Sequence, residues 1–299
     1  MAERIAQANG VEIAYETFGD PEDPPLLLVM GLASQMILWD EPLCEMFVSR
    51  GFRVIRFDNR DVGHSTHIKG GPKPKVLRAM AGITRNPHYT LEDMADDSFG
   101  LLDDLGIEAA HVVGASMGGM IAQTMAIRRP ERVLSLASVM STTGNRRAGI
   151  PRLRAFTVLL RRAPRDRDSY VEYVARIFKI IGSPGFDRDE QWIRKLAGES
   201  YDRGVDRAGP ARQIVAIQAS GDRTRALVGV RCPTVVVHGT DDPLIPVRAG
   251  RATARAIPGS ELIEIEGMGH DLPPELWPRI VDAVARNAER QLSKERSAA

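Results

Sequence analysis

The chain has 299 residues, of which 43% are apolar and 26% charged, as in an ordinary globular protein. Its 40 basic and 39 acidic side chains give a net charge of +1, so the charge offers no reason to expect a nucleic-acid partner. No segment approaches the roughly 20 uninterrupted apolar residues of a membrane-spanning helix, and the first residues lack the apolar run of a signal peptide. We therefore expect a cytoplasmic protein. Cys44 and Cys232 have no metal-ligand spacing and are expected to be buried, reduced thiols.

The first half of the chain predicts a hairpin followed by alternating strands and helices. Residues 3–8 and 11–18 are predicted strands joined by Asn9-Gly10, the strongest short signal for a hairpin turn. An apolar run over 26–30 predicts a strand buried on both faces, as in a parallel sheet covered by helices. The pattern then predicts a helix over 41–50, a strand over 53–57, a helix that begins after Thr90 and ends at Gly106, a strand over 111–113, a helix over 117–128 and a strand over 133–139.

The same alternation resumes near the end of the chain. It predicts a strand over 234–238, a helix through 249–256, a strand over 261–265 and a last helix over 275–290. Alternating apolar strands and helices indicate an α/β fold with a mostly parallel central sheet and helices on both faces.

Residues 143–222 interrupt this alternation. The stretch is helical in pattern and has no clear strand, so we interpret it as a helical cap inserted into a core formed by residues 1–142 and 223–299. Between 143 and 220 it carries 16 basic and 9 acidic residues. Its arginines cluster on either side of the apolar segment 155–160, at positions 146, 147, 152, 154, 161 and 162. Such a helix can bind an anionic lipid surface, although a solvated helix face would look the same.

One motif carries the chemistry. Gly114-Ala115-Ser116-Met117-Gly118 follows a predicted strand and precedes a predicted helix, which is the setting of a nucleophilic serine on a tight turn. Gly114 and Gly118 would let neighbouring backbone pass without a Cβ clash. The serine hydroxyl would project at the carboxyl edge of the sheet, where ligands bind in open α/β folds.

A serine needs a base and a group that orients the base. Asp241 and Asp242 come directly after the predicted strand 234–238, and His270 follows the strand 261–265. Parallel strands would bring all these groups to the same edge of the sheet as Ser116. The order Ser, Asp, His is more specific than the serine motif alone, and either aspartate satisfies it.

The negative charge that develops on a substrate oxygen also needs donors. We expect the backbone N–H of Met117, which follows the nucleophile, to be one of them. The second is expected from the loop after the strand 26–30, where Gly31 supports the turn and Leu32 N–H is the predicted donor.

The chain resembles the α/β-hydrolase superfamily over residues 10–290. The segments 58–65, 114–119 and 267–270 are similar to the group of the aclacinomycin methylesterase and the mycobacterial lipase/esterase G, and the similarity extends through 89–97 and 181–185. This resemblance implies Ser116 as nucleophile and His270 as base. It also selects Asp242 as the acid, because Asp242 precedes the apolar pair and proline at 244–246 by two residues. Two positions differ from common family members: Met30 stands where histidine is frequent, and Asp61 where glycine is common.

These residues predict hydrolysis of a small-molecule carboxylic ester without a metal or organic cofactor. A perhydrolase (haloperoxidase), thioesterase, carbon–carbon hydrolase or hydroxynitrile lyase would use the same residues. A protein of another class, a ligand-binding scaffold without catalysis, would not need all three. Met30, Met117 and Met120 are candidates for lining an acyl pocket. His64 could border the site but is interpreted as a turn residue, and His238 is expected to pack near the loop of the acid.

Overall fold

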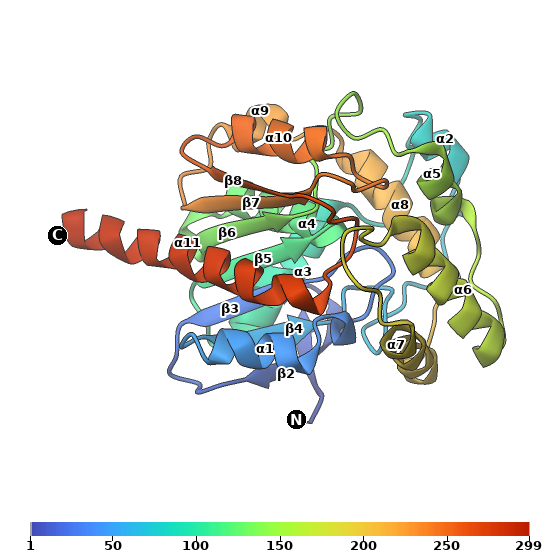
Figure 1. Ribbon diagram of the computed structural model, residues 1–299, viewed down its shortest axis with the longest axis horizontal. Coiled ribbons are helices and arrows are strands. Elements are labelled where there is room, and N and C mark those ends of the chain that lie inside the picture. The colour runs from blue at the N-terminus through green and yellow to red at the C-terminus, as the bar shows by residue number, and fades with distance from the viewer. Residues whose placement is uncertain (1, 299) are drawn as a thin grey trace.

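The computed structural model describes residues 2–298, without the side chains of residues 156, 159, 160 and 292–298. The described residues form an eight-stranded sheet in the order β1-β2-β4-β3-β5-β6-β7-β8 (Figure 1). Strands β1 and β2 pair antiparallel to their neighbours, and every pair from β4 to β8 is parallel. The strands are β1 (Arg4–Ala8), β2 (Val11–Phe18), β3 (Pro25–Val29), β4 (Arg53–Phe57), β5 (Ala110–Ala115), β6 (Val133–Val139), β7 (Thr234–Gly239) and β8 (Glu261–Ile265).

The helices fall on both faces of this sheet and at one of its ends. They are α1 (Glu41–Val48), α2 (Val76–Met80), α3 (Leu91–Asp104), α4 (Met117–Arg128), α5 (Leu153–Leu160), α6 (Arg167–Ile181), α7 (Glu190–Arg203), α8 (Gly209–Ser220), α9 (Thr224–Leu227), α10 (Val247–Ala256) and α11 (Trp277–Ala298). The predicted α/β fold with a mostly parallel sheet is therefore confirmed.

The hairpin forms where the sequence predicts it. Asn9 and Gly10 both have positive φ, +49° and +77°, which is the backbone of a two-residue turn whose twist matches that of the flanking strands. The turn sets the register in which Ala8 lies opposite Val11. This antiparallel pair forms one edge of the sheet.

Strand β3 shows why a strand in the parallel part of the sheet can be apolar at every position. Leu27 and Val29 belong to the core cluster that contains α3, α4 and α10, whereas Leu26 and Leu28 belong to the cluster that contains α1 and α11. Successive side chains of a strand point to opposite faces, so a strand with helices on both sides must be apolar at every position. Figure 1 shows α1 and α11 in front of the sheet and α3 and α4 behind it.

The start and the end of α3 follow local chemistry. The Thr90 hydroxyl accepts a hydrogen bond from Asp93 N, and the Asp93 carboxylate accepts one from Thr90 N, a reciprocal cap of the first turn. Beyond Asp104, Gly106 takes a left-handed conformation with φ +68°, which stops the helix.

The stretch between β6 and β7 contains α5–α9, and no strand is found there among the described residues. Figure 1 places α5, α6 and α7 at the end of the sheet where the parallel strands finish. In the part of the chain that the structure describes, no helix combines the length and apolarity needed to cross a bilayer.

Three local expectations need correction. Between 66 and 90, where the sequence pattern predicts neither a helix nor a strand, the structure contains the short helix α2. The last helix starts at Trp277, after a 3-10 turn over Pro274–Leu276, and continues past 290 to Ala298. Cys232 is only partly buried, whereas Cys44 is fully buried, and its burial raises the pKa of the Cys44 thiol to about 12.

Candidate active site

Ser116 lies on a strained turn between β5 and α4. Its φ of +56° and ψ of −118° are rare for a residue with a side chain and are held by the surrounding structure. Ser116 N donates to Val139 O at 2.9 Å, and the Ser141 hydroxyl donates to Ser116 O at 2.7 Å. Both backbone groups of the serine are thus fixed from β6 and the residues that follow it.

Glycines make this turn possible. A Cβ on Gly118 would lie 2.0 Å from Val29 O, and one on Gly114 would lie 2.2 Å from Gly118 O. Both distances are far shorter than a van der Waals contact, so neither position tolerates a side chain with this backbone conformation. Gly31 faces the turn from β3, where a Cβ would lie 3.1 Å from the Ser116 Cβ.

A row of hydrogen bonds joins the three polar groups that the sequence singles out. His270 Nε2 lies 2.9 Å from Ser116 Oγ, and His270 Nδ1 lies 2.6 Å from Asp242 Oδ2. The other oxygen of Asp242 accepts the backbone N–H groups of Leu244 and Ile245, each at 2.8 Å. The acid and the imidazole are both buried, so little water competes for these bonds.

The neighbouring Asp241 has a different position. Its Oδ2 accepts Gly267 N at 3.1 Å and the Thr240 hydroxyl at 2.8 Å, so it ties the loop after β7 to the loop after β8. Of the two aspartates, Asp242 is the one in contact with His270.

His238 supports the loop of the acid from inside the core. Its Nε2 lies 2.7 Å from Ile245 O, and the ring lies 3.7 Å from Asp242 Oδ2. Burial lowers the pKa of His238, so the ring is held neutral and donates from Nε2. His238 therefore packs beside the loop of the acid, as the sequence predicts.

The segment 181–185 holds the loop that carries His270. His270 N donates to Ile181 O at 2.7 Å, and Gly269 N donates to Ser183 Oγ at 2.8 Å. Gly185 N donates to Gly267 O at 2.9 Å. The segment 181–185, which the sequence comparison with the family singles out, therefore has a structural role beside the site.

The predicted anion donors lie on either side of Ser116. Met117 is the first residue of α4, where backbone N–H groups have no partner within the helix, and Leu32 lies in the loop after β3. That loop is held by the buried Gln213 of α8, whose Oε1 accepts Ala33 N at 2.8 Å and whose Nε2 donates to Arg60 O at 3.0 Å. Sequence reasoning missed Gln213, because a lone glutamine in a helical stretch carries no recognisable pattern.

Ser116 and His270 open into a cavity of about 1130 Å³. Much of its wall is apolar and comes from the inserted helices, and the apolar lining residues from α6 and α7 are Val174, Ile177, Phe178, Trp192, Ile193 and Leu196. Met30 borders the cavity, but Met117 and Met120 pack in the core behind it, so the acyl-pocket expectation is wrong for those two. His64 lies on the surface with its ring bonded to Glu3, as expected of a turn residue.

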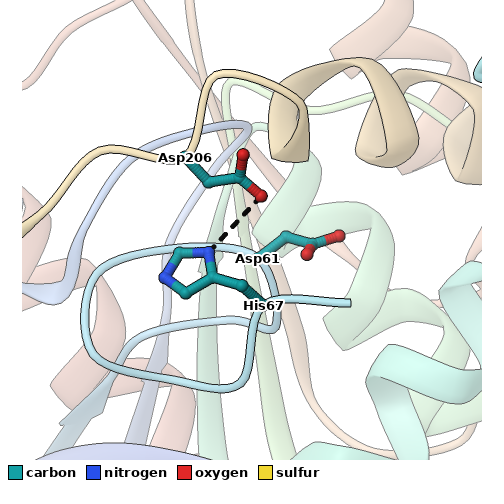
Figure 2. A group of neighbouring side chains, drawn as sticks. All are labelled: Asp61, His67 and Asp206. Carbon is teal, nitrogen blue, oxygen red and sulfur yellow. Dashed lines mark ion pairs between the residues drawn. The ribbon is translucent and has the colours of Figure 1, made fainter. Parts of the chain in front are cut away.

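A second polar cluster lies at the edge of this cavity. Figure 2 shows Asp61, His67 and Asp206 close together, with His67 Nδ1 3.4 Å from Asp206 Oδ2. Their spacing in the sequence did not suggest a metal site. Arg212 already binds both oxygens of Asp61, at 2.7 and 2.8 Å, and also pairs with Asp206. The guanidinium neutralises the charge that a metal ion would need, and the donor set therefore does not favour a metal.

The cluster instead explains the unusual aspartate at position 61. Asp61 is buried and receives Arg212 from α8 and the Tyr89 hydroxyl at 2.6 Å. The side chain thus fastens α8, which also carries Gln213, to the loop after β4. A glycine at position 61 could make none of these contacts.

Comparison with known proteins agrees with the fold. A profile of the alpha/beta hydrolase fold family matches residues 24–275, and the chain belongs to this family. Within it, the chain is close to the aclacinomycin methylesterase group. It is 28% identical to rhodomycin D methylesterase DauP of Streptomyces sp. (strain C5) over 294 residues, which cover 91% of this chain and 93% of the relative.

One further relative and one solved structure are also similar to this chain. The non-heme chloroperoxidase CPO-A1 of Kitasatospora aureofaciens is 28% identical over 277 residues, covering 88% of this chain and 90% of the relative. The crystal structure of the enol-lactonase from Burkholderia xenovorans LB400 superposes with a TM-score of 0.71 at 23% identity, covering 97% of this chain and all of that one. The last likeness concerns the fold alone.

Proposed function

We propose that this protein hydrolyses carboxylic esters through an acyl-enzyme formed on Ser116. The observation that carries the proposal is the row of hydrogen bonds from Ser116 through His270 to Asp242, which ends in a large, mostly apolar cavity. A nucleophile, a base within 3 Å and a buried acid behind the base are the parts that acyl transfer needs. The similarity to a methylesterase supports the same reaction class.

In the proposed reaction, His270 Nε2 accepts the Ser116 proton as Oγ attacks the ester carbonyl. His270 then gives this proton to the leaving alcohol, and the acyl group remains on Ser116. A water molecule loses a proton to His270 and attacks the acyl-enzyme, which releases the acid and restores the serine. Asp242 keeps the proton of the neutral imidazole on Nδ1 and stabilises the imidazolium.

The backbone N–H groups of Leu32 and Met117 are the proposed donors to the oxyanion. Removing one such donor from a hydrolase lowers kcat by roughly 10²–10³-fold. Both donors are backbone groups, so the side chain of Met30 in place of histidine does not remove them. The reaction requires no metal ion and no organic cofactor, because the charge is handled by N–H groups and a proton shuttle.

Residues 143–222 are proposed to act as the cap that shapes the substrate site. Their helices supply most of the apolar wall, whereas the sheet edge supplies the reactive groups. A cavity of about 1130 Å³ is slightly larger than the range of roughly 300–1,000 Å³ for small-molecule sites, so it fits a bulky or long acyl group better than acetate.

A series of p-nitrophenyl esters with acyl chains from C2 to C16 tests the function. The proposal expects hydrolysis by the wild type, with kcat/KM rising beyond C4, and loss of at least about 10³-fold with Ser116→Ala. Rates that are equal in the wild type and Ser116→Ala would refute it.

Perhydrolysis is the second candidate, because one relative over almost the full length is named a chloroperoxidase. Hydrogen peroxide would take the place of water and attack the same acyl-enzyme, which would yield a peracid. Measuring peracid formation from acetate and hydrogen peroxide beside ester hydrolysis separates the two functions. An ester hydrolase transfers the acyl group to water and forms little peracid.

A further inference from the structure

We propose that the mouth of the cavity is a docking surface for an anionic lipid bilayer. The surface consists of the segments 66–90 and 143–165, which we call the basic rim. These segments contain 12 lysines and arginines and not one aspartate or glutamate, whereas the rest of the chain has 28 basic and 39 acidic side chains. The inference concerns binding to a membrane and does not rest on the chemistry of Ser116.

The two segments of the basic rim are neighbours in space. The guanidinium of Arg146 donates to Met80 O at the end of α2, which joins the two segments directly. Figure 1 shows both α2 and α5 beyond the end of the sheet where the parallel strands finish. Both segments also border the cavity, the first through Lys73, Lys75 and Arg78 and the second through Arg161 and Arg162. A partner on the rim would therefore cover the entrance to the candidate active site.

The cations of the basic rim are available to a partner. In the part of the chain that the structure describes, none of the 12 forms a salt bridge with an acidic side chain. By contrast, arginines outside the rim, such as Arg60 with Asp97 and Arg212 with Asp61, are paired. Unpaired cations that lie around one cavity attract an anionic surface over roughly one Debye length.

Exposed apolar side chains lie among these cations. Leu77 is 69% exposed, Ile83 56%, Ile150 59% and Leu153 81%. A soluble anion would be recognised by the cations alone and would leave these side chains in water. A bilayer offers both partners, because acidic headgroups face the cations while the apolar side chains enter the boundary with the acyl chains. This pairing of exposed apolar and basic groups favours a lipid surface.

The segment 155–160 was singled out from the sequence for its place between arginine clusters. The side chains of Phe156, Leu159 and Leu160 lie outside the described residues, and the exposed side chains of Leu77, Ile83, Ile150 and Leu153 supply the apolar contact.

Sedimentation with vesicles tests the inference. Wild type and variants are mixed with sucrose-loaded vesicles of equal parts phosphatidylglycerol and phosphatidylcholine, or of phosphatidylcholine alone, at low and physiological salt. The wild type is expected to bind the anionic vesicles far more tightly, with binding that weakens as salt rises. No sedimentation with anionic vesicles at low salt would overturn the proposal, as would equal binding to both kinds of vesicle.

Two rim variants separate charge from apolar contact. Arg147→Ala/Arg152→Ala/Arg154→Ala should lower the partition coefficient on the order of 100-fold. Leu153→Ser/Ile83→Ser should lower it by roughly tenfold or more, because two apolar side chains no longer enter the lipid boundary. If the apolar variant binds as the wild type does, the surface recognises anions alone and the bilayer proposal fails.

Matched controls remove the same kinds of side chain elsewhere. Arg4→Ala/Arg225→Ala/Arg255→Ala removes three exposed arginines outside the rim. Ile5→Ser/Val228→Ser removes two exposed apolar side chains, 48% and 55% exposed. The controls should bind as the wild type does, and equal losses in rim and control variants would overturn the inference. Ser116→Ala should also bind normally, so a failure of the proposed ester hydrolysis is distinguishable from a failure of membrane docking.

Discussion

Replacing Asp242 by asparagine changes one atom beside His270 and should almost abolish the proposed reaction. In the native loop, Oδ1 of Asp242 accepts two backbone N–H groups and Oδ2 faces His270 Nδ1. An asparagine would keep its carbonyl oxygen toward Leu244 and Ile245. Turning the amide over would leave two buried N–H groups unpaired, at about 1–3 kcal/mol each. The NH2 group must therefore point at His270.

An amide donor at this position forces the wrong tautomer on the imidazole. His270 Nδ1 becomes the acceptor, so the ring proton moves to Nε2, 2.9 Å from the Ser116 hydroxyl. The ring then has no lone pair with which to accept the serine proton, and no carboxylate stabilises the imidazolium. We expect kcat to fall by about 10⁴-fold, roughly 5.5 kcal/mol, which is the loss known for the same change in a serine protease.

The assay is the initial rate of hydrolysis of a p-nitrophenyl ester at saturating substrate, with urea unfolding to show that stability is preserved. Asp241→Asn is the matched control, because this neighbour contacts Gly267 and Thr240 instead of the imidazole. It should keep kcat within about fivefold, since an asparagine can still accept those bonds. A kcat for Asp242→Asn within tenfold of the wild type, or a larger loss in Asp241→Asn, would refute the reasoning.

Three further predictions concern stability and are measured by urea unfolding. Gly118→Ala should destabilise the fold by about 3 kcal/mol or more, because its Cβ would meet Val29 O at 2.0 Å; a loss below 1 kcal/mol would contradict this packing. Arg212→Leu should cost about 3–5 kcal/mol, because it leaves Asp61 buried and unpaired, and the double change with Asp61→Asn should recover part of the loss; no recovery would argue against the ion pair. Burial lowers the folded-state pKa of His238, so stability is complete above the ordinary pKa of about 6.5 and falls as the pH drops below it. His238→Gln should show a shallower fall below pH 6.5, by up to about 1.4 kcal/mol per pH unit, and an unchanged slope would contradict the assignment.

Much of the fold follows from local chemistry that the sequence displays. The Asn9-Gly10 turn, the Thr90 cap and the apolar strands lie where their residue types predict them, because each depends on side chains close in the chain. The helix after Ser116 covers residues 117–128 as predicted, and the glycines on both sides of the serine lie where close backbone leaves no room for a Cβ.

The contacts that position the candidate site across the chain could not be predicted in the same way. Gln213 lies 180 residues from Ala33, and Arg212 lies 151 residues from Asp61. Neither pair has a spacing or periodicity that marks it, because the partners meet only after the inserted helices fold onto the sheet edge. The helix α2 was missed for a related reason: it has only five residues and is flanked by glycines and prolines, so its local signal is weak.

The two aspartates after β7, Asp241 and Asp242, could be predicted from the sequence only in part. The order of the residues and the parallel strands place both at the correct edge, but only the turn geometry decides which carboxylate faces His270. Asp242 is directed there because its other oxygen accepts two backbone N–H groups of the following residues, a local Asx-type turn.

The central claim is that Ser116 is the nucleophile, and covalent labelling tests it most directly. The protein is treated with a fluorophosphonate, and its intact mass and the labelled peptide are measured. We expect one phosphonyl group per chain on Ser116, no labelling of Ser116→Ala and strongly slowed labelling of Asp242→Asn. An unlabelled wild type, or a label on any other residue, would contradict the account.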